Sequence, residues 1–279
     1  MLSKSKKDAI KSLDKKRNII HSSTGGWIPG TGVFSHGYSM LDELVGEKTY
    51  FQIMVLNATG KLVSKALADW LEAIYGCLSW PDPRIWCNQI GALSGVAKTS
   101  VVAGTTIGVL AADARTYGIY PLIEGVEFIQ KSHKQYQKGL SVSELIELEI
   151  KAHKGKPHIM GYIRPIARGD ERLERMEKVS EKLGFEEGAH LKLAYNIEEE
   201  LQKRFNEGMN INGYISAFLS DQNFSSQEVY QIFSTLVMSG VTACHLEQAK
   251  KDPESFLPLR CEDIDYTGKK SRTITSEKK

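Results

Sequence analysis

The chain has 279 residues, of which 41% are hydrophobic and 25% are charged. This length and composition predict a globular protein that buries a large core, as one large or two modest domains. The net charge is only +2, and the basic surplus lies in the two ends, at residues 4–7 and 269–279, which is typical of solvated tails and argues against nucleic-acid binding.

Nothing in the sequence indicates a metal site or a membrane span. The four cysteines form no CxxC pair, which is typical of a reducing compartment and argues against a disulfide framework or a zinc site. The N-terminus lacks an apolar signal core, and the most apolar segment, residues 101–112, is too short to cross a bilayer. We therefore expect a cytoplasmic protein that binds neither metal nor membrane.

The first third of the chain predicts short elements followed by one strong helix. In chain order we expect a short helix or partly ordered arm at 4–17, an irregular Gly- and Ser-rich segment at 21–32, a short extended piece at 33–38, and short helices at 40–45 and 50–56. Apolar residues then recur at helical spacing from Leu62 to Ile74, which predicts a helix of about four turns.

The middle of the chain contains its most apolar helix. Residues 100–114 run almost without charge and predict a helix buried on all sides, with Gly104 and Gly108 placed to let another helix approach closely. Residues 117–121 break that helix, which would put Tyr117 and Tyr120 at an interior cleft, although such tyrosines are more often satisfied core residues.

The rest of the chain also follows helical periodicity. After a polar, basic run at 131–139, which indicates a hinge, helices are expected at 145–153, 171–183, 187–205, 212–219 and from 229 toward 245. Two of them begin with a capping box, Ser141 with Glu144 and Ser225 with Glu228. No strand alternation of useful length and no repeat is present, so the predicted fold class is all-α.

Residues 157–172 form the stretch with the clearest character of a site. Pro165 cannot continue a helix, so a loop is expected, and Asp170 can cap the helix that begins at 171. The arginines would converge where helix-terminal amides also favour anions, so phosphate or carboxylate is the expected ligand, with a solvated surface loop as the alternative. The three arginines are Arg164, Arg168 and Arg172.

Several segments carry motif-like patterns. Residues 33–46 resemble "RGYD...L", residues 210–224 resemble "N.DG.....L.DLGF", residues 240–248 resemble "G..AH..EQ", the loop resembles "GFGHP.Y...DPR", and residues 266–268 resemble "Y.G". In this order they resemble the citrate synthase superfamily, the group that includes citrate synthases and citryl-CoA lyases, from roughly residue 30 to residue 268.

The resemblance implies an all-α, citrate synthase-like fold. It implies a large helical domain made of residues 1–130 and 226–279, with a small helical domain of residues 131–225 inserted in it. It also implies a homodimer, or a pairing with a paralogous subunit. The implied ligands are CoA or an acyl-CoA, together with a keto or hydroxy acid.

In the family, a carboxylate takes a proton from the acyl-CoA methyl group while two histidines act on the enol and keto oxygens. The resemblance assigns the carboxylate to Asp221. The segment that matches "HGGA...E", residues 117–124, has no histidine, and Arg164 stands where "GH" has its histidine. Both family histidines are thus replaced in this sequence.

The replacements constrain the chemistry. A histidine with a pKa of about 6.5 can exchange a proton near neutrality, whereas an arginine stays protonated up to about pH 12. Arg164 can therefore polarise an oxygen but cannot act as an acid, and Tyr117 or Tyr120 could donate a hydrogen bond to an enolate oxygen. Loss of one oxyanion donor typically costs about 100- to 1000-fold in rate.

Three hypotheses remain open. The first is an acyl-CoA enzyme that makes or cleaves a carbon–carbon bond through an enolate, with Asp221 as the base. Its position at the end of a buried helix predicts a raised pKa unless neighbouring arginines offset the effect. Arg172 and Arg260 would hold a carboxylate, and Arg168 with Gly161 would hold CoA. The second is a catalytically inactive relative that binds CoA or a carboxylate, or serves as a partner subunit. The third is a helical interaction protein.

Overall fold

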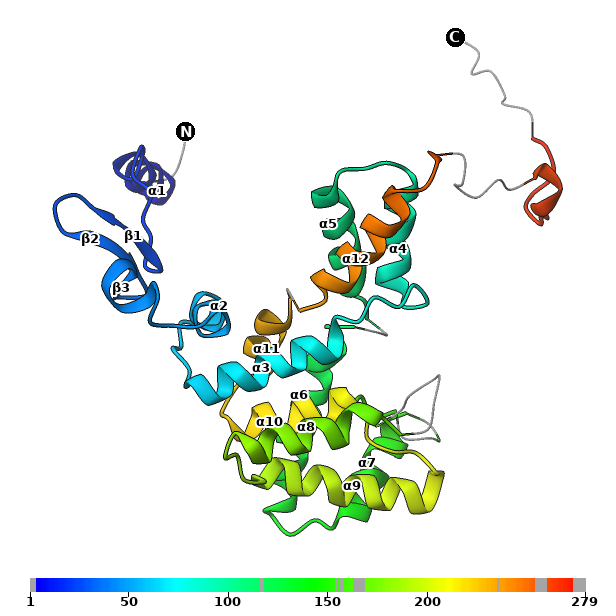
Figure 1. Cartoon of the computed structure of the whole chain (residues 1–279). Helices are drawn as coiled ribbons and strands as arrows, with labels where there is room; N and C mark the ends of the chain where they lie inside the picture. Colours follow the sequence, from blue (N-terminus) through cyan, green and yellow to red (C-terminus); the bar gives the residue numbers. More distant parts are fainter. Residues whose placement is uncertain are drawn as a thin grey trace. The chain divides into compact units, whose positions relative to one another are not determined.

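The computed structural model describes residues 4–115, 118–153, 155, 158–162, 169–234, 236–253 and 260–272 (Figure 1). It confirms the all-α class, since the sheet among these residues has three short strands. The α-helices are α1 (Lys4–Lys15), α2 (Tyr50–Thr59), α3 (Lys65–Leu78), α4 (Trp86–Val96), α5 (Val101–Ala112), α6 (Pro121–Tyr136), α7 (Val142–Ala152), α8 (Glu171–Lys182), α9 (Ala189–Phe205), α10 (Ile211–Asp221), α11 (Ser226–Phe233) and α12 (Met238–Ala249).

The chain forms two compact units. The first unit comprises Met1–Trp80 and Ala112–Val237, and the second comprises Pro81–Ala111 and Met238–Lys279. The boundaries of these two units differ from those of the predicted large domain (1–130 and 226–279) and small domain (131–225). The two predicted domains stay a prediction.

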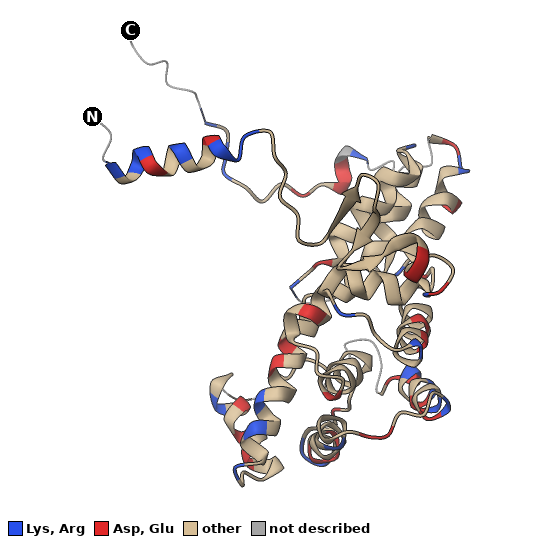
Figure 2. Cartoon of the chain, turned by 90° about the vertical axis from the view of Figure 1, so that its left-hand side faces the viewer, with Lys and Arg blue, Asp and Glu red and all other residues tan. Residues whose placement is uncertain are grey.

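The N-terminal segment contains a small antiparallel sheet. Strands β1 (Gly25–Ile28), β2 (Gly32–Ser35) and β3 (Tyr38–Ser39) follow one another, with Trp27 paired to Val33. The expected irregular segment at 21–32 is therefore wrong in part: Gly30, with a φ of +75°, allows a tight turn, and the flanking residues pair as a hairpin. Before the sheet, α1 mixes lysines with two aspartates and buries no residue (Figure 2).

Helix α10 is the centre of the first unit. It is flanked by α6, α8 and α9 (Figure 1), and all its residues from Gly213 to Ser220 are buried. The Trp70 ring of α3 stacks on Phe218 with centroids 4.0 Å apart. Ser180 lies between two aromatic residues, accepting from Trp70 Nε1 at 2.9 Å and bonding the Tyr214 hydroxyl at 2.8 Å. Aromatic stacking and a satisfied polar chain thus fix α10 in place.

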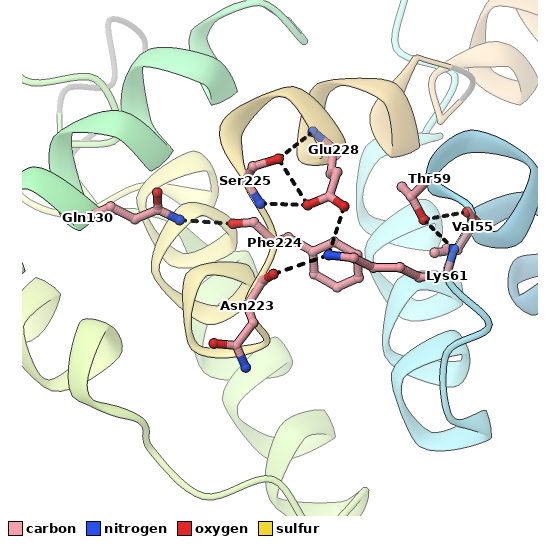
Figure 3. Close-up of polar contacts among 8 residues, drawn as sticks. All are labelled: Val55, Thr59, Lys61, Gln130, Asn223, Phe224, Ser225 and Glu228. Carbon is pink, nitrogen blue, oxygen red and sulfur yellow. Dashed lines mark hydrogen bonds and ion pairs between the residues drawn. The ribbon is translucent and has the colours of Figure 1, made fainter.

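Helices α6 and α10 run in the same direction. Along the first half of α10, Gly125 of α6 leaves no room for a side chain, because a Cβ there would lie 2.8 Å from Asn212 Oδ1 and 2.5 Å from Ser216 Oγ. Near its end, Gln130 of α6 donates to the Phe224 carbonyl at 2.9 Å (Figure 3). The first turn of α6 and the first turn of α10 therefore lie at the same end of the helix pair.

A polar cluster closes the other end of α10. Lys61 Nζ lies 2.7 Å from Glu228 Oε1 and 3.4 Å from the Asn223 carbonyl oxygen, above the Phe224 ring (Figure 3). Glu228 also completes the predicted capping box with Ser225, which is confirmed. The cluster joins the segment after α2 to the end of α10 and the start of α11.

Close helix approach through glycine is confirmed in the second unit. Cβ atoms on Gly104 and Gly108 of α5 would lie 2.1 Å from His245 Nδ1 and 2.2 Å from Val241 Cγ1, both on α12. Burial of α5 on all sides is wrong, because Val102 is 73% and Leu110 is 69% exposed. The glycine face packs against α12, while Val102 and Leu110 on the opposite face are not covered by other described residues of the second unit.

By length and composition alone, the range 226–249, with a mean hydropathy of 1.2, is long and apolar enough to cross a membrane. Its described parts include the separate helices α11 and α12. Val229, Phe233 and Val241 of this stretch are buried in the fold.

Gly104→Ala should destabilise the protein by about 1–3 kcal/mol, because the new methyl group would overlap the His245 ring. Gly76→Ala on α3 is the matched control: nothing lies within 4 Å of its Cβ position, and alanine is the better helix former by about 0.5–1 kcal/mol. Urea unfolding of both variants measures the difference. Equal stability of Gly104→Ala and the parent would show that α5 and α12 do not pack in this way.

Candidate functional site

The predicted loop meets the start of α10. Gly161 O accepts a hydrogen bond from Asn210 N at 2.8 Å, and the Asn210 side chain caps α10 by accepting from Asn212 N at 2.8 Å and Gly213 N at 3.4 Å. The Gly161 backbone has a φ of +100°, and a Cβ there would lie 2.6 Å from Gly213 Cα. Gly161 is thus required for the loop to lie on α10, while its role toward CoA stays a prediction.

Asp170 and Arg172 form a partly buried ion pair at the same place. Arg172 Nε and Nη2 donate to the two carboxylate oxygens at 2.8 and 2.6 Å, and the Asp170 side chain is 0% exposed. Asp170 accepts from Arg172 N at 3.2 Å, which confirms the predicted cap of α8, and from Ile211 N at 2.9 Å. Burial alone would raise the pKa of Asp170, but Arg172 and these N–H groups outweigh it and hold that pKa below its ordinary value.

The other predicted site residues are only partly described. Arg164, Arg168 and Tyr117 lie outside the described residues, so the convergence of three arginines stays a prediction. Arg260 belongs to the second unit, where it is exposed and its backbone N–H donates to Asp263 Oδ2 at 3.0 Å.

Tyr120 precedes the first turn of α6, at the same end of the helix pair as the start of α10. It is half-buried, and its ring meets the edge of Tyr230 with centroids 6.5 Å apart. The Tyr230 hydroxyl in turn donates to Asp113 Oδ2 at 2.9 Å. Tyr120 therefore lies toward the end of the helix pair where the loop meets α10. Its predicted catalytic role stays a prediction.

Asp221 lies at the opposite end of α10. It lies ten positions after Ile211, and at about 1.5 Å of rise per residue this is about 15 Å along the helix. Its Oδ1 accepts from His190 N and His190 Nδ1, each at 2.9 Å, and its Oδ2 accepts from Leu191 N at 3.0 Å. The structure thus separates Asp221 from Arg172 and uses it to cap α9.

The predicted rise in the pKa of Asp221 is wrong. Burial does act to raise it, but hydrogen bonds from the His190 side chain and from the His190 and Leu191 N–H groups lower it further, and the net pKa lies below its ordinary value. Gly188 precedes α9 and offers no side-chain cap, and a Cβ there would lie 2.1 Å from Asp221 Cγ. The distant carboxylate therefore takes the place of a local cap.

No known family model and no curated protein matches the sequence. Solved structures do match. Citryl-CoA lyase from Hydrogenobacter thermophilus aligns with a TM-score of 0.77 and 23% identity, over 92% of this chain and 98% of that one. This chain has the citrate synthase superfamily fold.

Two further structures with this fold are similar. ATP citrate lyase from Methanothrix soehngenii, solved with citrate and coenzyme A, aligns with a TM-score of 0.73 and 17% identity over 97% of this chain, which spans 45% of that protein. Citrate synthase from Thermoplasma acidophilum, solved with carboxymethyl coenzyme A and oxaloacetate, aligns with a TM-score of 0.59 and 15% identity over 81% of this chain and 60% of that one.

Asn212 is a candidate site residue that the sequence analysis did not single out. The superfamily pattern "N.DG.....L.DLGF" has two aspartates, and this chain has Asn212 at the first and Asp221 at the second. Only position 212 lies at the loop end of α10, where Asn212 Oδ1 accepts from Ser216 Oγ at 3.2 Å. The mismatch was visible in the sequence, but the pattern alone does not tell which aspartate faces the loop.

Among the described residues, no group of three or more His, Cys, Asp or Glu is arranged to hold a metal ion.

Asp221→Asn should destabilise the fold by about 1–3 kcal/mol at pH 7, because a buried charged cap is lost. The folded-state pKa is lowered, so the contribution of Asp221 is present above about pH 4 and is lost as the pH falls through that pKa. Parent and variant should therefore converge in urea unfolding once the pH has fallen below the lowered pKa of Asp221.

The control is Asp14→Asn, since Asp14 is paired only on the surface, with Arg17. It should change stability by less than about 0.5 kcal/mol. A loss in Asp221→Asn no larger than in this control at pH 7 would contradict the capping role.

Proposed function

We propose that this chain binds an acyl-CoA together with a carboxylic acid and does not make or cleave a carbon–carbon bond through Asp221. One observation carries the proposal. At the loop end of α10 lie the side-chain amides of Asn210 and Asn212 and the Asp170 carboxylate, which is paired with Arg172. At the other end of α10, the Asp221 carboxylate caps α9.

Physical requirements for a general base support this. A base must lie within hydrogen-bond reach of the proton that it removes, with a pKa near the working pH. Asp221 has a lowered pKa and both oxygens engaged, and Asp170 is paired with Arg172. The amide side chain of Asn212 cannot accept a proton in this way. These residues suit binding better than proton transfer.

The ligand class follows from the fold relatives and the arginines. The similar lyase and synthase structures hold citrate with coenzyme A, or carboxymethyl coenzyme A with oxaloacetate. We propose the same classes here, with Arg172 and Arg260 toward carboxylates, and Arg168 with Gly161 toward CoA.

The enzyme remains the second candidate, and one observation favours it. The match extends over 98% of the citryl-CoA lyase, so this chain has nearly the complete fold of a protein with that activity. In that case Arg164 with Tyr117 or Tyr120 would stabilise the oxygens, and the base would be a residue other than Asp221.

We also propose a homodimer, or a pairing with a paralogous subunit, through α5. Val102, Thr106 and Leu110 are spaced four apart and all exposed, so they form one face of the helix. Exposed apolar side chains on one helix face, here Val102 and Leu110, indicate an interaction surface. Self-association buries such a face symmetrically.

Calorimetry should show binding of CoA and acetyl-CoA to the parent protein, without catalysis of proton exchange. NMR should find that α-protons of acetyl-CoA exchange with deuterium no faster than in buffer, with or without oxaloacetate. A citrate synthase serves as the positive control. Exchange of the acetyl-CoA α-protons above the buffer rate would favour the enzyme. Absence of CoA binding in calorimetry would contradict the proposal.

Val102→Asp with Leu110→Asp should convert the dimer to a monomer in sedimentation, because the charges could not be buried in the interface. Leu148→Asp, an exposed leucine on α7, is the control and should leave the mass unchanged. A parent protein that is monomeric, or a double variant that stays dimeric, would reject α5 as the interface.

A further inference from the structure

The guanidinium of Arg172 has two edges that can each donate a pair of hydrogen bonds. The side edge, Nε with Nη2, is taken by the Asp170 carboxylate at 2.8 and 2.6 Å. The end edge, Nη1 with the second N–H of Nη2, has no partner among the described residues. Since the Arg172 side chain is 22% exposed, an incoming molecule can reach it.

Asp170 is itself held rigidly. Its side chain is 0% exposed and accepts two backbone N–H bonds, from Arg172 N at the start of α8 and from Ile211 N at the start of α10. The carboxylate is therefore fixed by two helices, and a side-on pair then fixes the plane of the guanidinium.

We propose that Asp170 is a positioning residue that aims the end edge of Arg172 at a carboxylate of the bound acid. The inference rests on the proposed function and deepens it, because it names the residue that orients Arg172 toward the acid. The end edge presents two parallel N–H donors at the spacing of carboxylate oxygens, so the acid forms a bidentate pair. Pre-orientation removes the side-chain ordering that a free arginine undergoes on binding.

The chain contains its own matched control. Arg84 donates from Nε and Nη2 to Asp82 at 3.1 and 2.6 Å, with the same spacing in the sequence as the Asp170 pair. The Arg84 side chain is 86% exposed, so this pair lies on the surface. Loss of Asp82 removes the same bonds without touching the start of α10.

The test is calorimetric titration of the full chain with citrate and, separately, with CoA. Asp170→Asn and Arg172→Lys should each weaken citrate binding by about tenfold or more, since a lysine lacks the planar fork and an unheld arginine loses its orientation. Both variants should bind CoA within about twofold of the parent. Asp82→Asn should bind both probes as the parent does.

Two further readouts separate positioning from a structural role. In Arg172→Ala, adding Asp170→Asn should not weaken citrate binding further, because Asp170 acts through Arg172. In NMR, the Arg172 Nε–H of the parent should exchange slowly with solvent and should lose that protection in Asp170→Asn. If Asp170→Asn does not fold, two measurements test the proposal instead: the exchange rate of the Arg172 Nε–H in the parent, and the citrate affinity of Arg172→Lys.

The contrary outcomes are distinct. Citrate affinity unchanged in Asp170→Asn, or citrate and CoA affinity lost in parallel, would overturn the positioning role while leaving the proposed function standing. An unprotected Arg172 Nε–H in the parent would overturn it as well. A parent that binds neither citrate nor CoA would overturn the proposed function, and the inference with it.

Discussion

A helix buried along its length leaves its first N–H groups without water, so other parts of the chain must bond them. This constraint determines the arrangement around α10. At its start, Asp170 and Asn210 accept the free N–H groups, and Asp170 brings the loop and α8 with it. At its end, Asp221 performs the same task for α9. Two buried carboxylates thus join three helices.

This use of aspartates has a functional consequence. A carboxylate that accepts several hydrogen bonds is stabilised in its ionised form, and the same bonds make it a weak base. Asp170 and Asp221 both have lowered pKa values for this reason. With Asn212 at the position of the other pattern aspartate, the loop end of α10 is better suited to holding an anion than to removing a proton.

Local signals in the sequence predicted local structure well. The capping boxes at Ser141 and Ser225 and the cap at Asp170 were readable because the partners lie within three residues of one another. The close approach through Gly104 was readable because small residues in an apolar helix have few other uses. The motif order likewise identified the fold.

Long-range features were not readable in the same way. The hydrogen bond between Asp221 and His190 joins residues 31 positions apart in the sequence. A pattern that contains two aspartates also does not state which of them faces the loop. The hairpin around Gly30 was missed because glycine permits both a tight turn and an irregular segment. Exposure of α5 depends on a partner surface, which periodicity within one chain cannot describe.

The most direct test of the central claim is a crystal structure with acetyl-CoA bound. We predict that the thioester methyl group lies at the loop end of α10, beside Asn212 and with Arg172 near, while both Asp221 oxygens still accept the N–H groups of His190 and Leu191. A methyl group in contact with the Asp221 carboxylate, with those bonds broken, would contradict the claim and return Asp221 to the role of a base.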